Sequence, residues 1–187
     1  MLGATNHSDT QREVNDYYAT DPRTIDALVG KYELPRKIWK PCCGEGHLAK
    51  RLVALGYDVV ASDIVDRGFG SVADFFTEDL PDGAMCILTN PPYKFADNVI
   101  HRALELLPNG GVVAMFLKTQ FLEGKARFHN LFSITPPLKV LQFAGRIVCA
   151  KNGDFETMKK AGSAVAYAWF IWEKGWKGNT TIEWIEP

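Results

Sequence analysis

Apolar runs of strand length alternate along the chain with segments whose apolar residues recur every three or four positions. The runs cover residues 37–40, 58–62, 84–89 and 112–117. The run at 112–117 is continuously apolar, as in a sheet that helices cover on both faces. Helical periodicity follows at 48–55 and again at 95–107. This alternation predicts an α/β fold: a Rossmann-like, doubly wound sheet that is mostly parallel.

The last third of the chain has a different pattern. A helix is expected at 123–132, short strands at 138–143 and 146–150, and a long apolar strand at 163–172. The polar segment 151–162 between them is expected to be a mobile loop. Because no helix separates the final strands, they predict a C-terminal antiparallel hairpin at the edge of the sheet.

The first 15 residues are polar and predict a flexible N-terminal tail, followed by a single domain over residues 16–187. Asp21 and Pro22 then predict a helix start, since an Asp can cap a helix and proline suits its first position. Tyr18 and Thr20 directly precede this helix. They are candidates for contact with a cofactor, although a tyrosine here could equally pack the helix onto the sheet.

Asn90, Pro91, Pro92 and Tyr93 directly follow the apolar run 84–89. Proline cannot continue a strand, so this tetrapeptide is expected just past the carboxyl end of a strand, where open α/β sheets bind ligands. The Asn90 side-chain oxygen and the Pro91 carbonyl could accept both hydrogens of an exocyclic amine, and Tyr93 could stack on its ring. The alternative is a Pro-Pro turn whose tyrosine only packs.

A glycine-rich turn links the strand at 37–40 to the helix at 48–55. It contains Pro41, Cys42, Gly44 and Gly46. Strand, glycine turn and helix form the arrangement of a nucleotide-cofactor site, because glycine lets the backbone approach a ligand closely. A simple strand-to-helix turn would have the same composition.

Asp63 ends the next strand, 17 positions after Gly46. An acidic residue at the tip of the second strand binds ribose hydroxyls in nucleotide folds. Further along, an adenine could be held by Asp74, which would accept its amine hydrogens, and by Phe75 or Phe76, which would stack on its ring. Core packing accounts for Phe75 and Phe76 equally well.

Charge is nearly balanced over the 187 residues, with a net charge of −1. Residues 118–160 carry eight Lys or Arg against three Asp or Glu, which is 8 − 3 = +5. A locally basic segment suits a phosphate backbone, and a solvated loop is the alternative.

Cysteines and histidines give no sign of a metal site. The four cysteines form no C-x-x-C pair, and the four histidines are scattered. We expect reduced thiols and no metal. No signal peptide or membrane-spanning run is evident, so a cytoplasmic protein is expected; the family resemblance described next implies the cytoplasm of a bacterium or a phage-infected host.

With these motifs in place, the chain resembles S-adenosylmethionine-dependent N6-adenine DNA methyltransferases of the small type found in phages and prophages. Asn90 to Tyr93 match the catalytic tetrapeptide of that family, and residues 41–46 match its cofactor loop. The resemblance implies the class I methyltransferase fold, S-adenosylmethionine as cofactor and DNA as partner. It also implies that Asp63, Asp74 and Phe75 contact the cofactor, and that 18–22 cap its methionine end.

Three departures from the family stand out. Lys40 occupies a position that is usually acidic, where a cation would repel a sulfonium. Asp21 stands where proline is common, and no separate target-recognition domain is visible. Two alternatives therefore remain: an RNA base methyltransferase, or an inactive subunit of methyltransferase fold that binds nucleic acid. The oligomeric state and recognition sequence stay open.

Overall fold

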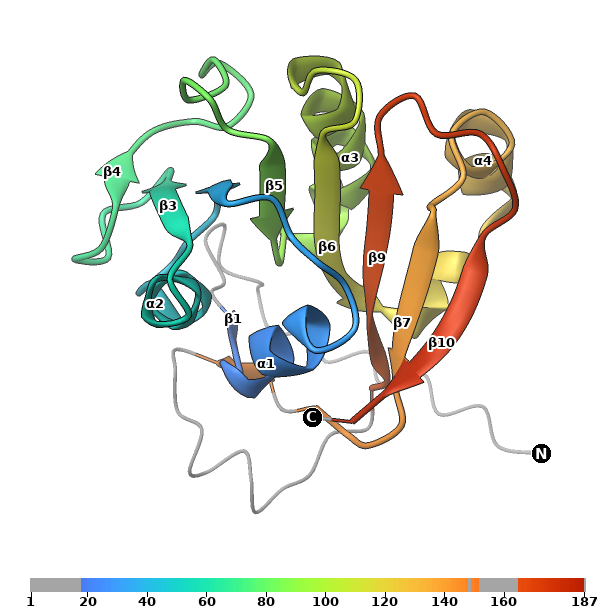
Figure 1. The fold of residues 1–187 in the computed structure, drawn as a ribbon, viewed down its shortest axis with the longest axis horizontal. Coiled ribbons are helices and arrows are strands. Elements are labelled where there is room, and N and C mark those ends of the chain that lie inside the picture. Colours follow the sequence, from blue (N-terminus) through green and yellow to red (C-terminus); the bar gives the residue numbers. More distant parts are fainter. Residues whose placement is uncertain (1–17, 148, 152–164, 187) are drawn as a thin grey trace, which may run out of the picture.

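The computed structural model describes residues 18–147, 149–151 and 165–186. Its centre is an eight-stranded sheet in the order β10-β7-β9-β6-β5-β2-β3-β4 (Figure 1). The strands are β2 (Lys37–Lys40), β3 (Asp58–Asp63), β4 (Ser71–Val72), β5 (Cys86–Thr89), β6 (Val112–Lys118), β7 (Lys139–Phe143), β9 (Tyr167–Glu173) and β10 (Thr181–Ile185). The predicted α/β class and the positions of the first four long strands are confirmed.

The direction of the strands changes only around β9. It runs antiparallel to both β6 and β7, and the other neighbouring pairs are parallel. The antiparallel pair is thus present, but its predicted position at the sheet edge is wrong, because β10 lies outside β7 and forms the edge. β10 escaped prediction because it is short and mostly exposed, so it has no apolar run.

The strand expected at 146–150 does not join the main sheet. It is β8 (Cys149–Lys151), which pairs with β1 (Tyr18–Thr20) in a separate antiparallel ribbon. Thr20 lies opposite Cys149 in this register. The strand expected at 163–172 is observed as β9. The expected tail 1–15, the loop residues 152–162 and residues 163–164 lie outside the described residues.

Helices cover both faces of the sheet and bury two apolar layers. On one face lie α1 (Arg23–Val29) and α2 (His47–Ala54), and on the other lies α3 (Ala96–Leu106) (Figure 1). The helical residues that enter these layers are Ile25, Leu28, Leu48 and Leu52 on the first face and Val99, Ile100 and Ala103 on the second. The expected helix at 123–132 is α4 (Lys125–Arg127) continued by a π-helical turn, Phe128–Phe132.

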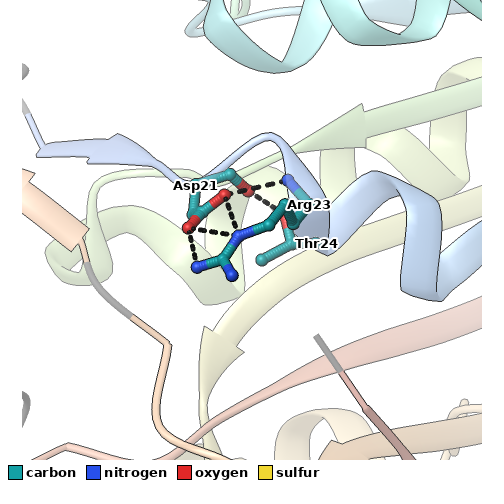
Figure 2. Close-up of polar contacts among 3 residues, drawn as sticks. All are labelled: Asp21, Arg23 and Thr24. Carbon is teal, nitrogen blue, oxygen red and sulfur yellow. Dashed lines mark hydrogen bonds and ion pairs between the residues drawn. The ribbon is translucent and has the colours of Figure 1, made fainter. Parts of the chain in front are cut away.

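Asp21 organises the junction between β1 and α1 (Figure 2). Its backbone carbonyl accepts the N–H and the hydroxyl of Thr24, at 3.0 and 2.7 Å. Its carboxylate accepts the backbone N–H of Arg23 at 3.0 Å and the Arg23 guanidinium at 2.6 Å. Asp21 therefore caps the helix start as predicted, and the helix itself begins at Arg23. This junction fixes the end of β1, and with it Thr20.

Candidate active site

Asn90 lies where the first strand of the chain meets the end of β5. Its side-chain Nδ2 donates to the Thr20 hydroxyl oxygen at 2.8 Å, across 70 positions of sequence. Thr20 is buried, and it lies opposite Cys149 of β8 in the β1–β8 ribbon. The nitrogen end of the Asn90 amide thus faces β1, which leaves the carbonyl end to face away from it.

Tyr93 follows in a single 3-10 turn, Tyr93–Phe95, and its ring is 39% exposed. The ammonium of Lys118, at the end of β6, lies 4.5 Å from the ring centroid. Burial raises the pKa of the Tyr93 hydroxyl far above the usual range, and the neighbouring Tyr167 acts in the same direction. The phenol therefore stays neutral, with part of the residue accessible. Pro91 is buried and Pro92 exposed.

Asp63 joins the glycine turn to the tip of β3. One carboxylate oxygen accepts the Gly44 N–H at 2.8 Å, and the other accepts the Val65 N–H at 3.1 Å. Gly44 has a φ of 57°, and the non-glycine Cys42 has a φ of 50°. A carboxylate bound by two N–H groups keeps lone pairs for further donors such as hydroxyls.

Gly46 lies against an aromatic ring, a contact that the sequence did not predict. A Cβ on Gly46 would lie 2.3 Å from the ring of Phe69, and the Gly46 φ is 82°. The side chain that approaches this glycine is therefore Phe69, from the loop after β3, whose ring also lies 5.0 Å from the Lys50 ammonium. Only tertiary structure brings Phe69 onto the turn, so no local signal could have identified it.

Lys40 is the most deeply buried charged side chain near the site, at 2% exposure. Its ammonium donates to the carbonyls of Pro41 and Cys42, each at 3.0 Å, and to the Thr89 hydroxyl oxygen at 3.1 Å. Thr89 in turn donates its hydroxyl hydrogen to the Pro41 carbonyl at 2.5 Å. Lys40 thus links the turn at 41–46 to Thr89, the residue that precedes Asn90.

This bonding fixes the protonation state of Lys40. Burial lowers its pKa, and the nearby Cys42, Cys43 and Asp63 act in the opposite direction. Because the Thr89 hydroxyl hydrogen is already used, all three Lys40 partners are acceptors, and only an ammonium has three hydrogens to give. The prediction that Lys40 simply faces a ligand is therefore incomplete: its charge is directed to the backbone of the turn.

The remaining predicted residues divide between the site and the core. Phe75 is buried and packs on Trp39 with ring centroids 5.1 Å apart, so the packing alternative holds for it. Asp74 starts a turn by accepting the Phe76 N–H at 3.0 Å. Tyr18 is exposed at the start of β1, close enough to Tyr93 to influence its pKa.

Neither a membrane span nor a metal cluster is found in the part of the chain that the structure describes. No helix there has the length and apolarity to cross a bilayer. No group of three or more His, Cys, Asp or Glu side chains within those residues is placed to hold a metal ion.

Comparison with known proteins places this geometry within a known fold. No protein-family model matches the sequence, and no curated protein matches it significantly. Among solved structures, the 23S rRNA methyltransferase ErmE is 16% identical, with a TM-score of 0.58 over 87% of this chain and 73% of its own. A candidate class I S-adenosylmethionine-dependent methyltransferase from Listeria monocytogenes is 13% identical, with a TM-score of 0.55 over 87% of this chain.

A dimethyladenosine transferase from Plasmodium falciparum is 14% identical, with a TM-score of 0.53 over 84% of this chain. The chain spans 62% of the length of both the Listeria and the Plasmodium protein. At these identities the likeness concerns the fold, and it confirms the predicted class I methyltransferase architecture.

Proposed function

We propose that this protein transfers a methyl group from S-adenosylmethionine to the exocyclic N6 amine of adenine, with DNA as the expected substrate. The observation that carries the proposal is the fixed amide of Asn90 at the end of β5. Its nitrogen is bonded to Thr20, which directs the opposite, accepting end of the amide away from β1. An acceptor of this kind is what an aromatic amine needs in order to become a directed nucleophile.

Binding of the cofactor is assigned to the turn at 41–46 and to Asp63. The Asp63 carboxylate is rigidly held by Gly44 and Val65 and retains accepting capacity for ribose hydroxyls. Gly44, with its left-handed backbone, keeps the turn free of side chain at this point. When bound, S-adenosylmethionine would supply an electrophilic methyl group. These residues fit such a ligand, and Asp74 and exposed Phe76 would approach its adenine from the β4 side.

In the proposed reaction, Asn90 and the Pro91 carbonyl accept the two hydrogens of the target amine, and Tyr93 stacks on the base. S-adenosylmethionine, held by the turn at 41–46 and Asp63, would supply the methyl group to the amine nitrogen and leave as the thioether, and the methylated amine would release one proton to water. An adenine in a duplex must leave the stack to reach Asn90. The chain would contribute orientation and electrostatic stabilisation, with no strong base.

An RNA substrate is the second candidate. The observation that favours it is the likeness to ErmE, a 23S rRNA methyltransferase, and to a dimethyladenosine transferase. Both candidates use the same proposed residues, so they differ in the polymer that carries the adenine.

The inactive-subunit alternative depends on Lys40, and the geometry argues against treating this residue as a lesion. The Lys40 ammonium is satisfied by three acceptors of the turn and of β5. An acidic residue in its place would face two carbonyl oxygens and a hydroxyl oxygen with no hydrogen to give. In this chain Lys40 therefore suits its surroundings better than a glutamate would.

Two measurements test the proposal. Calorimetry with S-adenosylmethionine should give binding that Asp63→Ala weakens by at least about tenfold, since ribose contacts are lost. A labelled-methyl assay on duplex DNA and on single-stranded RNA, both containing adenine, then separates the two substrates. Absence of binding at millimolar cofactor would contradict the proposed function and would favour the inactive-subunit alternative.

A further inference from the structure

A hollow of about 410 Å³ opens beside the exposed ring of Tyr93. Its wall is formed by the end of β6 and the segment that follows, including Lys118, Gln120, Phe121 and Arg127. The hollow therefore adjoins the proposed catalytic tetrapeptide, and anything that extends from a base stacked on Tyr93 would meet it.

Arg127 holds this wall together through three hydrogen bonds of its guanidinium. Its guanidinium donates to Asp97 at 2.9 Å and to the carbonyls of Phe121 and Glu123 at 2.8 and 2.7 Å. These contacts join the segment after β6 to the start of α3, which directly follows the turn that holds Tyr93 and Phe95. Two separate stretches of chain are thus held together as one rigid rim.

Exposed aromatic rings and lysines belong to the two stretches of chain that form this rim. We call the set the Tyr93 surface: Tyr93, Lys94, Phe95, Lys118, Lys125 and Phe128. Phe95 is exposed and Phe128 is 54% exposed. The ammonium groups of Lys94 and Lys118 lie over the rings of Phe95 and Tyr93, at 5.3 and 4.5 Å from their centroids. Lys125 is exposed at the start of α4.

The charges of the predicted basic segment are not all on this surface. Lys118 and Arg127 border the hollow, together with the acidic Glu123, and Lys125 follows the lining residue Gly124. Lys139 pairs with Glu183 of edge strand β10 at 2.5 Å, and Arg146 follows β7. The side chains of Lys151, Lys159 and Lys160 lie outside the described residues. Two described cations of the basic segment, Lys118 and Arg127, therefore lie beside Tyr93, where they are combined with aromatic rings.

We propose that the Tyr93 surface binds single-stranded nucleic acid next to the target adenine; this inference rests on the proposed function. Unpaired bases offer free faces that stack on exposed aromatic rings, and lysines between the rings suit the phosphates that link those bases. Paired bases are already stacked inside a duplex and have no face to offer. Without nucleic acid, the Lys118 ammonium lies over the Tyr93 ring. When a base stacks on that ring, the ammonium moves aside and binds a neighbouring phosphate.

The test uses fluorescence anisotropy with 12-nucleotide probes that carry one adenine among pyrimidines. Single-stranded DNA, single-stranded RNA and duplex DNA are compared with the full chain. Both single strands should bind at least about tenfold more tightly than the duplex. Phe128→Ala should weaken single-strand binding between about 5-fold and 150-fold, the range expected for loss of one stacking platform. Lys118→Gln should reduce the salt slope by about 0.7, which corresponds to one phosphate contact on a single strand.

Trp184→Ala is the matched control, because the aromatic residue Trp184, on edge strand β10, is 66% exposed and so even more accessible than Phe128. Duplex binding equal to single-strand binding, or an effect of Trp184→Ala as large as that of Phe128→Ala, would overturn the inference. Cofactor affinity is measured on the same variants and should not change. If the cofactor binds but single-stranded probes bind no more tightly than the duplex, this inference alone is refuted. If single-stranded probes bind more tightly but the cofactor does not bind, the proposed function alone is refuted.

Discussion

At the scale of single residues, each threonine hydroxyl of the candidate site has one hydrogen to donate. Where that hydrogen is used, the hydroxyl can only accept from its other neighbours. Thr89 uses its hydrogen on Pro41 and therefore accepts from Lys40. Thr20 accepts from the Asn90 Nδ2, so the nitrogen end of that amide faces it. Thr89 thus positions Lys40, which ties the turn at 41–46 to β5, and Thr20 positions Asn90, on which the proposed chemistry depends.

Replacing Asn90 tests its proposed role directly. Asn90→Ala removes the acceptor for the target amine and should lower kcat by about 10²- to 10³-fold, as loss of one preorganised polar group does elsewhere. Calorimetry should show unchanged cofactor affinity, because Asn90 is assigned to the substrate. An equal loss of cofactor binding would place Asn90 in the cofactor site instead.

Thr20 was predicted to contact the cofactor, and its bond to Asn90 suggests a positioning role. Thr20→Val keeps the shape of the side chain but loses the acceptor, so the Asn90 amide can rotate. We expect kcat to fall by about 10- to 100-fold with KM for the cofactor unchanged. Thr20→Ser should restore most of the rate, and a rise in cofactor KM without a change in kcat would restore the original assignment.

The family resemblance suggests that an acidic residue at position 40 would strengthen cofactor binding. The contacts of Lys40 predict instead that an acidic residue there would destabilise the protein. Lys40→Glu should destabilise the protein by about 3–5 kcal/mol, because a buried carboxylate would face acceptors without a partner. Lys40→Met removes the charge together with its acceptor contacts and should cost less, about 1–2 kcal/mol. Urea unfolding measures both variants. Tighter cofactor binding by a stable Lys40→Glu variant would support the lesion interpretation.

At the scale of elements, the glycine turn and the loop after β3 form one unit through Gly46 and Phe69. Gly46→Ala should destabilise the protein by about 2 kcal/mol or more, since it combines a left-handed backbone with a clash against the Phe69 ring. In Phe69→Ala the same glycine change should cost clearly less. A double-mutant cycle by urea unfolding measures this coupling, and strict additivity would show that the ring is not the obstacle.

Elements with a strong local pattern could be predicted, and those that depend on distant contacts could not. The tetrapeptide after β5 and Asp63 at the end of β3 lie at the expected strand ends, because proline and an apolar run mark those ends locally. The pairing of β1 with β8 involves residues more than 120 positions apart, with only three residues in each strand. The Lys40 side chain could point to solvent or to the turn, and only packing decides between them.

At the scale of the whole molecule, buried thiols and phenols make stability depend on pH. Burial raises the pKa of Cys149 to about 11 and that of Tyr32 to about 12, from ordinary values of 9.0 and 10.0. A group whose pKa is raised on folding contributes stability that is complete below its unfolded pKa and is lost as pH rises through the folded value. We therefore expect Tm to fall from about pH 9 upward.

A thermal unfolding series from pH 7 to pH 11 checks this expectation, with low salt and the thiols kept reduced. Tyr32→Phe serves as the control, because it removes one of the groups that must ionise and should flatten the decline above pH 10. A Tm that is constant to pH 11 would show that these groups are not held neutral by the fold.

Mass spectrometry of the product identifies the atom that receives the methyl group, which the proposal assigns to the N6 nitrogen of adenine. Wild-type protein is incubated with methyl-deuterated S-adenosylmethionine and an adenine-containing oligonucleotide, with Asn90→Ala in parallel. The account predicts deuterated N6-methyladenine in the digested wild-type product and a yield lower by at least about 10²-fold with the variant. A methyl group on another base or atom, or equal yields from both proteins, would contradict it.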